Sequence, residues 1–389
     1  MKIAIASSGV GHVARGMESW AISLARALHD RNIKVTLFRG KGSIKNKYDV
    51  VLPTLGRGTP VARLLGNLGK IGGWRVGIGN DHDIEVFTYG LQLIYHMRKR
   101  KIDLLHIQQA KLANLLLHAR KVGLLFTPFV LGNGQKVPAR WLDKIPYAHC
   151  LTPYGKKELT DEIGERPEWR VIPNFVDTSL FSPGDSVTAR KRLGFPEKGF
   201  IVLTVGIIEK TVKRMDYVIR EIEHLNKALN VPATLLMAGA PREDTNEIEA
   251  MGKALLGDRF ILIRNVPLND MPDLYRLSDV FVLGSFREAL GIVIIEALSC
   301  GVPVVCHHFP VMKWVVKDGG ECIDLSKDTT LAVVLKNYLL NEDFRKRKGE
   351  LARKRIIETF SESVVVPKII NMYQEILELE RAKKNSTKI

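Results

Sequence analysis

Residues 285–303 read SFREALGIVIIEALSCGVP, and this stretch decides the fold class. A run with the composition of a buried strand, DVFVLG at 279–284, precedes it. Gly291 stands where a helix would begin, and Gly301 followed by Pro303 is a typical helix stop. The stretch therefore predicts a strand, a polar loop, a helix and a second strand at 302–305, which together form one βα unit of a parallel sheet.

Two glutamates, Glu288 and Glu296, lie on either side of the predicted helix start. Glu288 belongs to the loop, and Glu296 falls about two turns into the helix, roughly 12 Å along its axis. A helix that begins after a strand presents unpaired backbone N–H groups that suit a phosphate. The arrangement predicts a phosphate site with a carboxylate on each side. It matches a sugar nucleotide, in which the diphosphate lies between a sugar and a ribose.

The rest of the chain continues the alternation of strands and helices that is typical of doubly wound parallel α/β folds. Its 389 residues suit two domains of about 180 residues each. Strands are expected at 2–6, 35–38, 103–107, 124–130 and 147–152, and then at 200–205, 233–239, 260–264, 280–283 and 302–305. A glycine-rich segment at 53–83 interrupts the pattern, and a loop this long inside a compact domain is usually functional.

The chain is strongly basic, with 58 Lys and Arg against 42 Asp and Glu, a net charge of +16. Such a surface suits a nucleotide or an anionic membrane face. No helix-turn-helix, RNP or zinc pattern is present, so we expect no specific nucleic-acid partner. The four cysteines lack ligand spacing, and we expect neither a metal nor a cofactor. No apolar run approaches the roughly 18 to 20 residues that a transmembrane helix needs, and no signal peptide is evident. We therefore expect a cytoplasmic protein. Its basic clusters suggest that it associates with the inner face of the membrane.

The pattern of Ser285, Glu288, Gly291, Glu296 and the run GVPVV at 301–305 resembles the signature of the retaining glycosyltransferases of family four, the group 1 transferases. The resemblance implies a GT-B fold, in which two Rossmann-like, doubly wound parallel-sheet domains face each other across a cleft. It also implies transfer, with retention and without a metal, of a sugar from a UDP- or GDP-linked donor. The acceptor would be a lipid-linked, glycan or small-molecule compound.

The family resemblance also divides the chain. The run VIPNFVD at 171–177, followed by FSP at 181–183, is similar to the point where the family crosses from one domain to the next. It implies an acceptor domain at 1–172 and a nucleotide-sugar domain at 173–363. Residues 364–389 resemble the terminal helix that crosses back to the first domain, followed here by a basic tail.

Site residues follow from the same resemblance. Glu288 would hold a hydroxyl of the donor sugar, and Glu296 the ribose hydroxyls. Backbone N–H groups at Leu290 and Gly291 would bind the distal phosphate, and Ser285 opens the same donor-binding loop.

The resemblance also implies that a lysine supplies the positive charge that stabilises the leaving phosphate. The family carries V-G-R-x5-K-G, and Lys213 matches its lysine, so we expect Lys213 and Glu288 to be catalytic. Ile207 occupies the arginine position of the motif. Lys210 and Arg214 are alternative sources of the missing charge.

The first loop, SSGVGH at 7–12, is the candidate site of the N-terminal domain, through Gly9, Gly11 and His12. Further cleft candidates are His106, Gln108, Asn133 and Gln135. The pattern Gly9-x-Gly11-x-x-Ala14 also fits a dinucleotide-binding turn, and Arg39 after the next strand could meet a 2′-phosphate. Alternative functions are therefore an NADP-dependent oxidoreductase, a nucleotide-sugar epimerase or phosphorylase of the same fold, and a binding scaffold without turnover.

Overall fold

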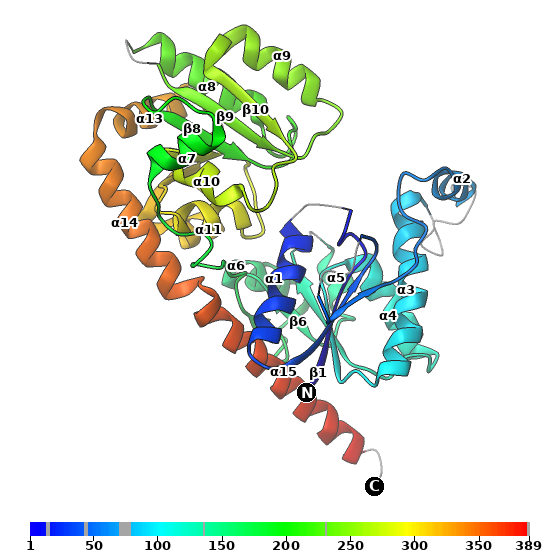
Figure 1. Cartoon of the computed structure of the whole chain (residues 1–389). Helices are drawn as coiled ribbons and strands as arrows, with labels where there is room; N and C mark the ends of the chain where they lie inside the picture. Colours follow the sequence, from blue (N-terminus) through cyan, green and yellow to red (C-terminus); the bar gives the residue numbers. More distant parts are fainter. Residues whose placement is uncertain (13–15, 43–45, 70–78, 135–136, 230–231, 387–389) are drawn as a thin grey trace. The chain divides into compact units, whose positions relative to one another are not determined.

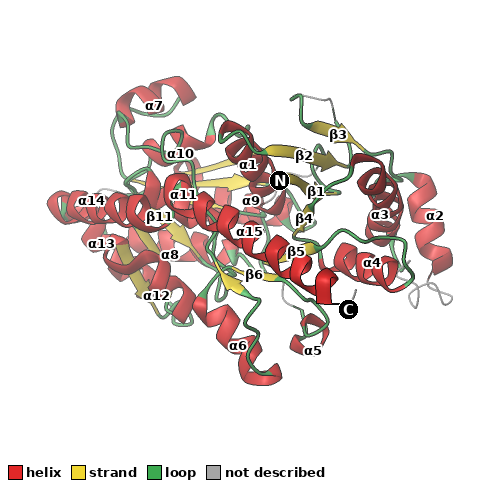
Figure 2. Ribbon diagram, turned by 90° about the horizontal axis from the view of Figure 1, so that it is seen from below, coloured by secondary structure: helices red, strands yellow, loops and turns green. Residues whose placement is uncertain are grey.

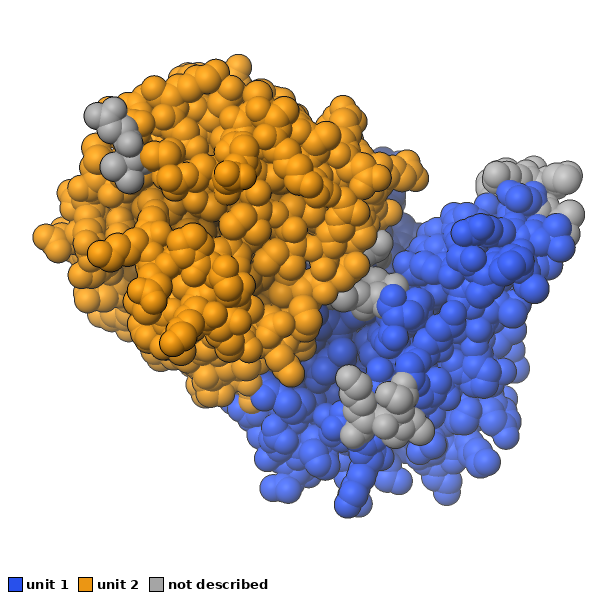
Figure 3. Space-filling model, turned by 45° about the horizontal axis from the view of Figure 1, so that its top comes forward, with its two compact units in different colours: residues 1–173, 366–389 blue, residues 174–365 orange. Residues whose placement is uncertain are grey.

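The computed structural model describes residues 1–12, 16–42, 46–69, 79–134, 137–229 and 232–386. The chain forms two compact units (Figure 3): unit 1 comprises Met1–Pro173 and Val366–Ile389, and unit 2 comprises Asn174–Val365. Each unit is built on its own parallel sheet flanked by helices (Figures 1 and 2), so the predicted α/β class with two parallel-sheet domains is confirmed.

Unit 1 contains a seven-stranded sheet in the order β3-β2-β1-β4-β5-β6-β7, with every pair parallel. Its strands are β1 (Lys2–Ser7), β2 (Lys34–Arg39), β3 (Asp49–Val51), β4 (Leu104–Ile107), β5 (Phe129–Asn133), β6 (Ala148–Cys150) and β7 (Arg170–Val171). Its helices are α1 (Gly16–Asp30), α2 (Pro60–Gly69), α3 (Asp81–Arg100), α4 (Ala110–Lys121), α5 (Ala139–Leu142) and α6 (Pro153–Ile163). The order reverses between β1 and β4, and ligands of open α/β sheets bind at the carboxyl ends of the strands beside such a reversal.

The central strands of unit 1 are almost wholly apolar because helices cover both of their faces. In β1, each residue after Lys2 is buried, and the same holds for all four residues of β4. One predicted strand was too long: residues 124–128 precede β5 as a loop in which Leu124 and Phe126 are exposed.

Unit 2 contains a six-stranded parallel sheet in the order β10-β9-β8-β11-β12-β13. Its strands are β8 (Ile201–Val205), β9 (Thr234–Gly239), β10 (Phe260–Arg264), β11 (Val280–Leu283), β12 (Val304–His307) and β13 (Gly320–Ile323). Its helices are α7 (Ser186–Leu193), α8 (Met215–Lys227), α9 (Thr245–Leu256), α10 (Met271–Arg276), α11 (Ile292–Ser299), α12 (Pro310–Val316), α13 (Thr330–Leu340) and α14 (Glu342–Thr359). The reversal here lies between β8 and β11, the strand that leads into residues 285–303.

A last helix, α15 (Glu362–Ser386), starts in unit 2 and continues into unit 1. Within unit 1 it packs on the sheet, where the Tyr373 hydroxyl is hydrogen-bonded to His106 and Arg170 is ion-paired with Glu375. Among the described helices, none is both long and apolar enough to cross a membrane.

Candidate functional site

The loop after β11 and the start of α11 have the geometry that the sequence predicted. Gly291 is the N-cap of α11 with φ +79°, a left-handed conformation that glycine adopts without strain. Leu290 is buried and anchors the loop, so the first N–H groups of the helix follow directly. Ser285 is also buried, and among the described residues its Oγ has no hydrogen-bond partner. This end of α11 therefore offers donor groups to a ligand.

Lys213 and Glu288 form an ion pair in unit 2. Lys213 comes from the loop between β8 and α8, and Glu288 from the loop before α11. Each side chain is 16% exposed, so the pair is shielded yet reachable. The structure thus brings together the two residues that the sequence marked as catalytic, and the positive charge of one balances the negative charge of the other.

Glu296 lies in α11 and accepts a hydrogen bond of 2.7 Å from the hydroxyl of Tyr275 on α10. Burial raises the pKa of Glu296 from its ordinary 4.5 to about 7, although the Tyr275 hydrogen bond lowers it. The sequence did not indicate Tyr275, because a single tyrosine in a short helix has no informative spacing. Glu296 thus has a polar partner but no cationic one among the described residues.

The two alternative cations have other partners. The Arg214 guanidinium lies 3.9 Å from the ring centre of Phe286 and 4.1 Å from that of Tyr217, and it donates to the carbonyls of Gly284 and Leu325. It therefore braces the loops that follow β8, β11 and β13. The ammonium of Lys210 is ion-paired with Glu247 on α9. Of the three cations predicted for the donor phosphate, Lys213 is the one that contacts a predicted site carboxylate.

In unit 1, the first loop is tied to a buried glutamate that the sequence did not indicate. Glu85 of α3 receives hydrogen bonds from Ser8 Oγ and from His12 Nε2, each of 2.9 Å. Gly9 and Gly11 lie between these residues, and neither has space for a side chain. A Cβ at Gly9 would lie 2.2 Å from Oε1 of Glu18, and one at Gly11 would lie 1.8 Å from the carbonyl oxygen of Lys41.

Two of the remaining cleft candidates, His106 and Gln108, are buried in unit 1. His106 is fully buried between Tyr373 (2.7 Å) and His149 (3.3 Å), and burial lowers its pKa well below 6.5, so it is a neutral interior group. Gln108 is also buried. Its neighbour Gln109 is the residue that reaches the loop, accepting from the Ser8 N–H at 3.0 Å. Asn133 is the last residue of β5.

Some of the sequence predictions lie outside the described residues. These are Ala14, Gln135 and positions 70–78 of the glycine-rich segment. Arg39, which the NADP interpretation requires, is buried and ion-paired with Asp49 at 2.8 Å. That pairing does not favour a 2′-phosphate at Arg39.

One cluster has the composition of a metal site. Potential ligand atoms of His307, His308 and Asp324 lie within 4.8 Å of one another after β12 and β13. Nδ1 of His307 accepts from the N–H of Leu325 at 3.2 Å, which places the proton of the neutral ring on Nε2. Metal binding through Nε2 would require the other tautomer and the loss of this hydrogen bond.

Comparison with known proteins identifies the family. Residues 14–180 match the family model described as Glycosyltransferase Family 4, and residues 185–355 match that of Glycosyl transferases group 1. Among curated relatives, a D-inositol 3-phosphate glycosyltransferase of Acidothermus cellulolyticus is 31% identical over 172 residues, covering 42% of this chain and 38% of the relative. An N-acetyl-alpha-D-glucosaminyl L-malate synthase of Bacillus anthracis is 24% identical over 210 residues, which are 54% of each protein. The chain thus spans about half or less of the length of these relatives.

Two solved structures share the fold over nearly the whole chain. Sucrose-phosphate synthase from Thermosynechococcus elongatus superposes with a TM-score of 0.79 at 18% identity, covering 97% of this chain and 99% of the other. Anabaena HepE in complex with UDP-glucose gives 0.74 at 16% identity, covering 96% and 100%. Since the two family models adjoin and each unit has the parallel α/β sheet of one GT-B domain, the chain belongs to the family-four, group 1 glycosyltransferases.

Proposed function

We propose that this chain is a retaining glycosyltransferase that uses a UDP-linked sugar. The observation that carries the proposal is the arrangement around α11 in unit 2. The Lys213–Glu288 ion pair lies on the loop side of the helix start, and the Glu296–Tyr275 hydrogen bond lies in the helix beyond it. This order matches the order of groups in a sugar nucleotide.

Each group has a defined role in the proposed reaction. The first N–H groups of α11 bind the distal phosphate, and Glu296 accepts the ribose hydroxyls. Glu288 holds a hydroxyl of the donor sugar. As the glycosidic bond breaks, negative charge develops on the phosphate oxygen, and the ammonium of Lys213 stabilises it. Retention follows if the acceptor attacks from the face that the phosphate leaves, with the phosphate taking the acceptor proton.

The identity of the donor is supported by the relatives. HepE was solved with UDP and with UDP-glucose, and both chains have the same fold. The donor-site residues contact phosphate, ribose and sugar in the proposed mode and leave the base unspecified. GDP sugars are therefore the matched comparison in any binding experiment.

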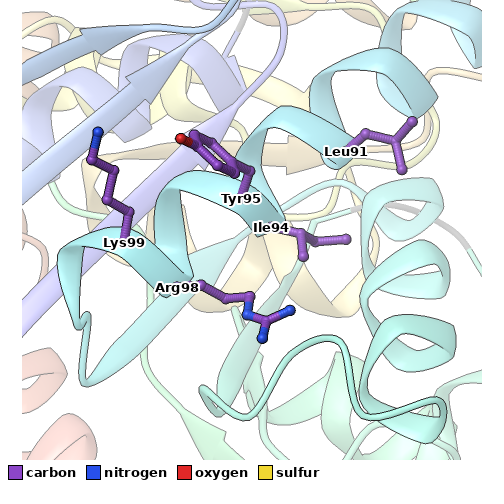
Figure 4. Close-up of a pocket in the computed structure, with 5 residues that line it drawn as sticks. All are labelled: Leu91, Ile94, Tyr95, Arg98 and Lys99. Atoms are coloured by element: carbon purple, nitrogen blue, oxygen red, sulfur yellow. The ribbon is translucent and has the colours of Figure 1, made fainter.

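We propose that the acceptor is a small or lipid-linked compound. We also propose that unit 1 carries a surface that faces the membrane. Leu91 and Tyr95 are more than half exposed on α3, next to Arg98 and Lys99. These side chains and Ile94 line a groove of about 520 Å³ along the helix (Figure 4). Apolar side chains beside basic ones suit an anionic bilayer.

The donor proposal is tested by titration calorimetry with UDP-glucose, GDP-mannose and NADPH. We expect saturable binding of the UDP sugar to the wild type and to Glu350→Ala, a surface control on α14. Glu296→Ala should weaken binding at least about tenfold, as loss of a hydrogen-bonded charge does. Binding of NADPH alone, unchanged in Glu296→Ala, would support the oxidoreductase instead. Analysis of the sugar product separates transfer from epimerisation.

Membrane binding is tested by co-sedimentation with vesicles. The wild type should sediment with phosphatidylglycerol vesicles and much less with neutral phosphatidylcholine vesicles. Tyr95→Ser combined with Arg98→Gln should reduce the bound fraction, whereas Arg264→Gln in unit 2 should not. Equal binding of all three proteins would contradict the assigned surface.

A further inference from the structure

Two cysteines of unit 2 lie side by side on neighbouring strands. Cys306 belongs to β12 and Cys322 to β13, and the parallel register makes these two residues direct partners. Their Sγ atoms lie 3.7 Å apart, and both residues are free thiols. They stand sixteen positions apart in the sequence, so the sheet and not a short motif brings them together.

The backbone at this pair already has the spacing that a disulfide needs. Adjacent strands of a sheet lie about 4.8 Å apart, and disulfides bridge Cα atoms that are about 4.4 to 6.8 Å apart. Register decides whether two side chains can meet, because a slip of one residue would turn one of them to the other face of the sheet. Here the register is correct, so rotation of the two side chains is enough to join the sulfur atoms.

The two thiols differ in how they meet solvent. Cys306 is fully buried, and its strand β12 lies inside the sheet between β11 and β13. Cys322 is partly exposed, and its strand β13 forms the edge of the sheet. A reagent from solvent therefore reaches Cys322 first, while Cys306 waits beside it. An accessible thiol next to a second, resolving thiol is the usual arrangement of a redox-sensitive pair.

The remaining cysteines provide an internal reference. Cys150 and Cys300 are both buried, and burial raises the pKa of each thiol to about 12. The thiolate is the form that reacts with an oxidant, so both residues should be inert while the chain is folded.

We propose that Cys306 and Cys322 form a redox-active pair that a peroxide converts into a disulfide. The thiolate of Cys322 attacks one oxygen of the peroxide, the O–O bond breaks, and the other oxygen leaves as hydroxide, which takes up a proton to become water. The sulfur of Cys306 then attacks the sulfenic acid at Cys322. The S–S bond forms as the S–O bond breaks, and the departing hydroxide leaves as water with the proton of the Cys306 thiol. Two thiols are oxidised by two electrons in total, and one hydrogen peroxide is reduced to two waters. The proposal does not depend on the glycosyltransferase function.

The test treats the full chain with hydrogen peroxide, blocks the remaining thiols by alkylation, and maps tryptic peptides by mass spectrometry without reduction. Trypsin leaves Cys300 and Cys306 together in residues 288–313 and places Cys322 in residues 318–327. We expect these two peptides to be linked in the wild type and in the matched control Cys300→Ala, and to separate again after dithiothreitol. Cys306→Ala should abolish the link. If the link persisted in Cys306→Ala, it would belong to Cys300 and the assigned pair would be wrong.

The rate and the intermediate test the assigned roles. In the folded wild type, Cys322 should be oxidised at least about tenfold faster than Cys150 or Cys300, because exposure and thiolate content set the rate. In Cys306→Ala, the oxidation of Cys322 should stop at the sulfenic acid, which dimedone labels. Cys322→Ser, at a partly exposed position, should leave Cys306 unoxidised under the conditions that link the wild type. Oxidation of all four cysteines at one rate, or dimedone labelling of Cys322 in the wild type without any linked peptide, would overturn the proposal.

Discussion

Replacing Glu296 with glutamine should stabilise the free protein at high pH and weaken donor binding at the same time. Glu296 is placed where its charge is costly: its pKa in the folded protein is about 7 against an ordinary 4.5. A shift of this size corresponds to about 3 kcal/mol at about 1.4 kcal/mol per pH unit. Because the residue keeps some exposure, solvent screening reduces our expectation to about 1 to 2 kcal/mol.

The sign follows from proton uptake. Between pH 4.5 and 7 the folded state retains a proton at Glu296 that the unfolded state has lost, so stability falls as pH rises through this window. Above pH 7 the folded protein bears the full free-energy cost of burying the ionised Glu296. Near pH 4 this cost vanishes because Glu296 is protonated in both the folded and the unfolded state. Glutamine has no charge to bury, so its advantage over glutamate should grow from pH 4.5 to 7 and then stay constant.

The assay is a thermal melt of wild type and Glu296→Gln at pH 5 and pH 8. For a unit of this size, 1 to 2 kcal/mol corresponds to a rise in Tm of about 2 to 8 °C at pH 8, with a much smaller difference at pH 5. Glu350→Gln on the surface of α14 should show neither change. An equal Tm difference at both pH values would refute the reasoning, since packing rather than ionisation would then explain it.

Two further substitutions test the remaining geometry. Lys213→Met should lower kcat by about 10² to 10³, the usual effect of removing one group that stabilises transition-state charge. The control Lys210→Met should keep kcat within about tenfold of the wild type. Steady-state kinetics with a UDP sugar measures both values. Gly11→Ala should destabilise unit 1 by about 2 kcal/mol or more, because φ is +106° and the new Cβ would lie 1.8 Å from the carbonyl oxygen of Lys41. Gly123→Ala, with positive φ but open space, should cost only about 1 kcal/mol, and urea melts of the two variants should differ accordingly.

The sequence predicted the local structure of the proposed donor site well because its information is contiguous. The strand, loop, helix and glycine stop of residues 279–303 are contiguous, and β11, Gly291 and α11 appear where the spacing put them. Lys213 is distant in sequence, yet a short motif located it. Tyr275 was missed, since its contact with Glu296 depends on how α10 packs beside α11.

The surroundings of the first loop of unit 1 were predicted less completely because several loops and a helix assemble them. The sequence identified Gly9, Gly11 and His12 from a glycine pattern, but the residue that organises them, Glu85, lies within α3 without any motif. It also singled out Gln108 where the adjacent Gln109 makes the contact. Successive side chains at the end of a strand point in opposite directions, so the two glutamines face different surroundings.

Glu85 and Glu296 differ in how the protein satisfies a buried carboxylate, and the difference indicates what each does. Glu85 has a guanidinium, an imidazole, a hydroxyl and a backbone N–H, and its pKa is lowered. A carboxylate so fully paired has little capacity left for a ligand, and it serves to hold its donors. Glu296 has one tyrosine hydroxyl, and its pKa is raised. A carboxylate short of donors gains most from a ligand that supplies hydroxyl groups, and a ribose supplies two of them side by side. The same chemistry that makes Glu296 costly in the free protein therefore makes it the better candidate for ligand recognition.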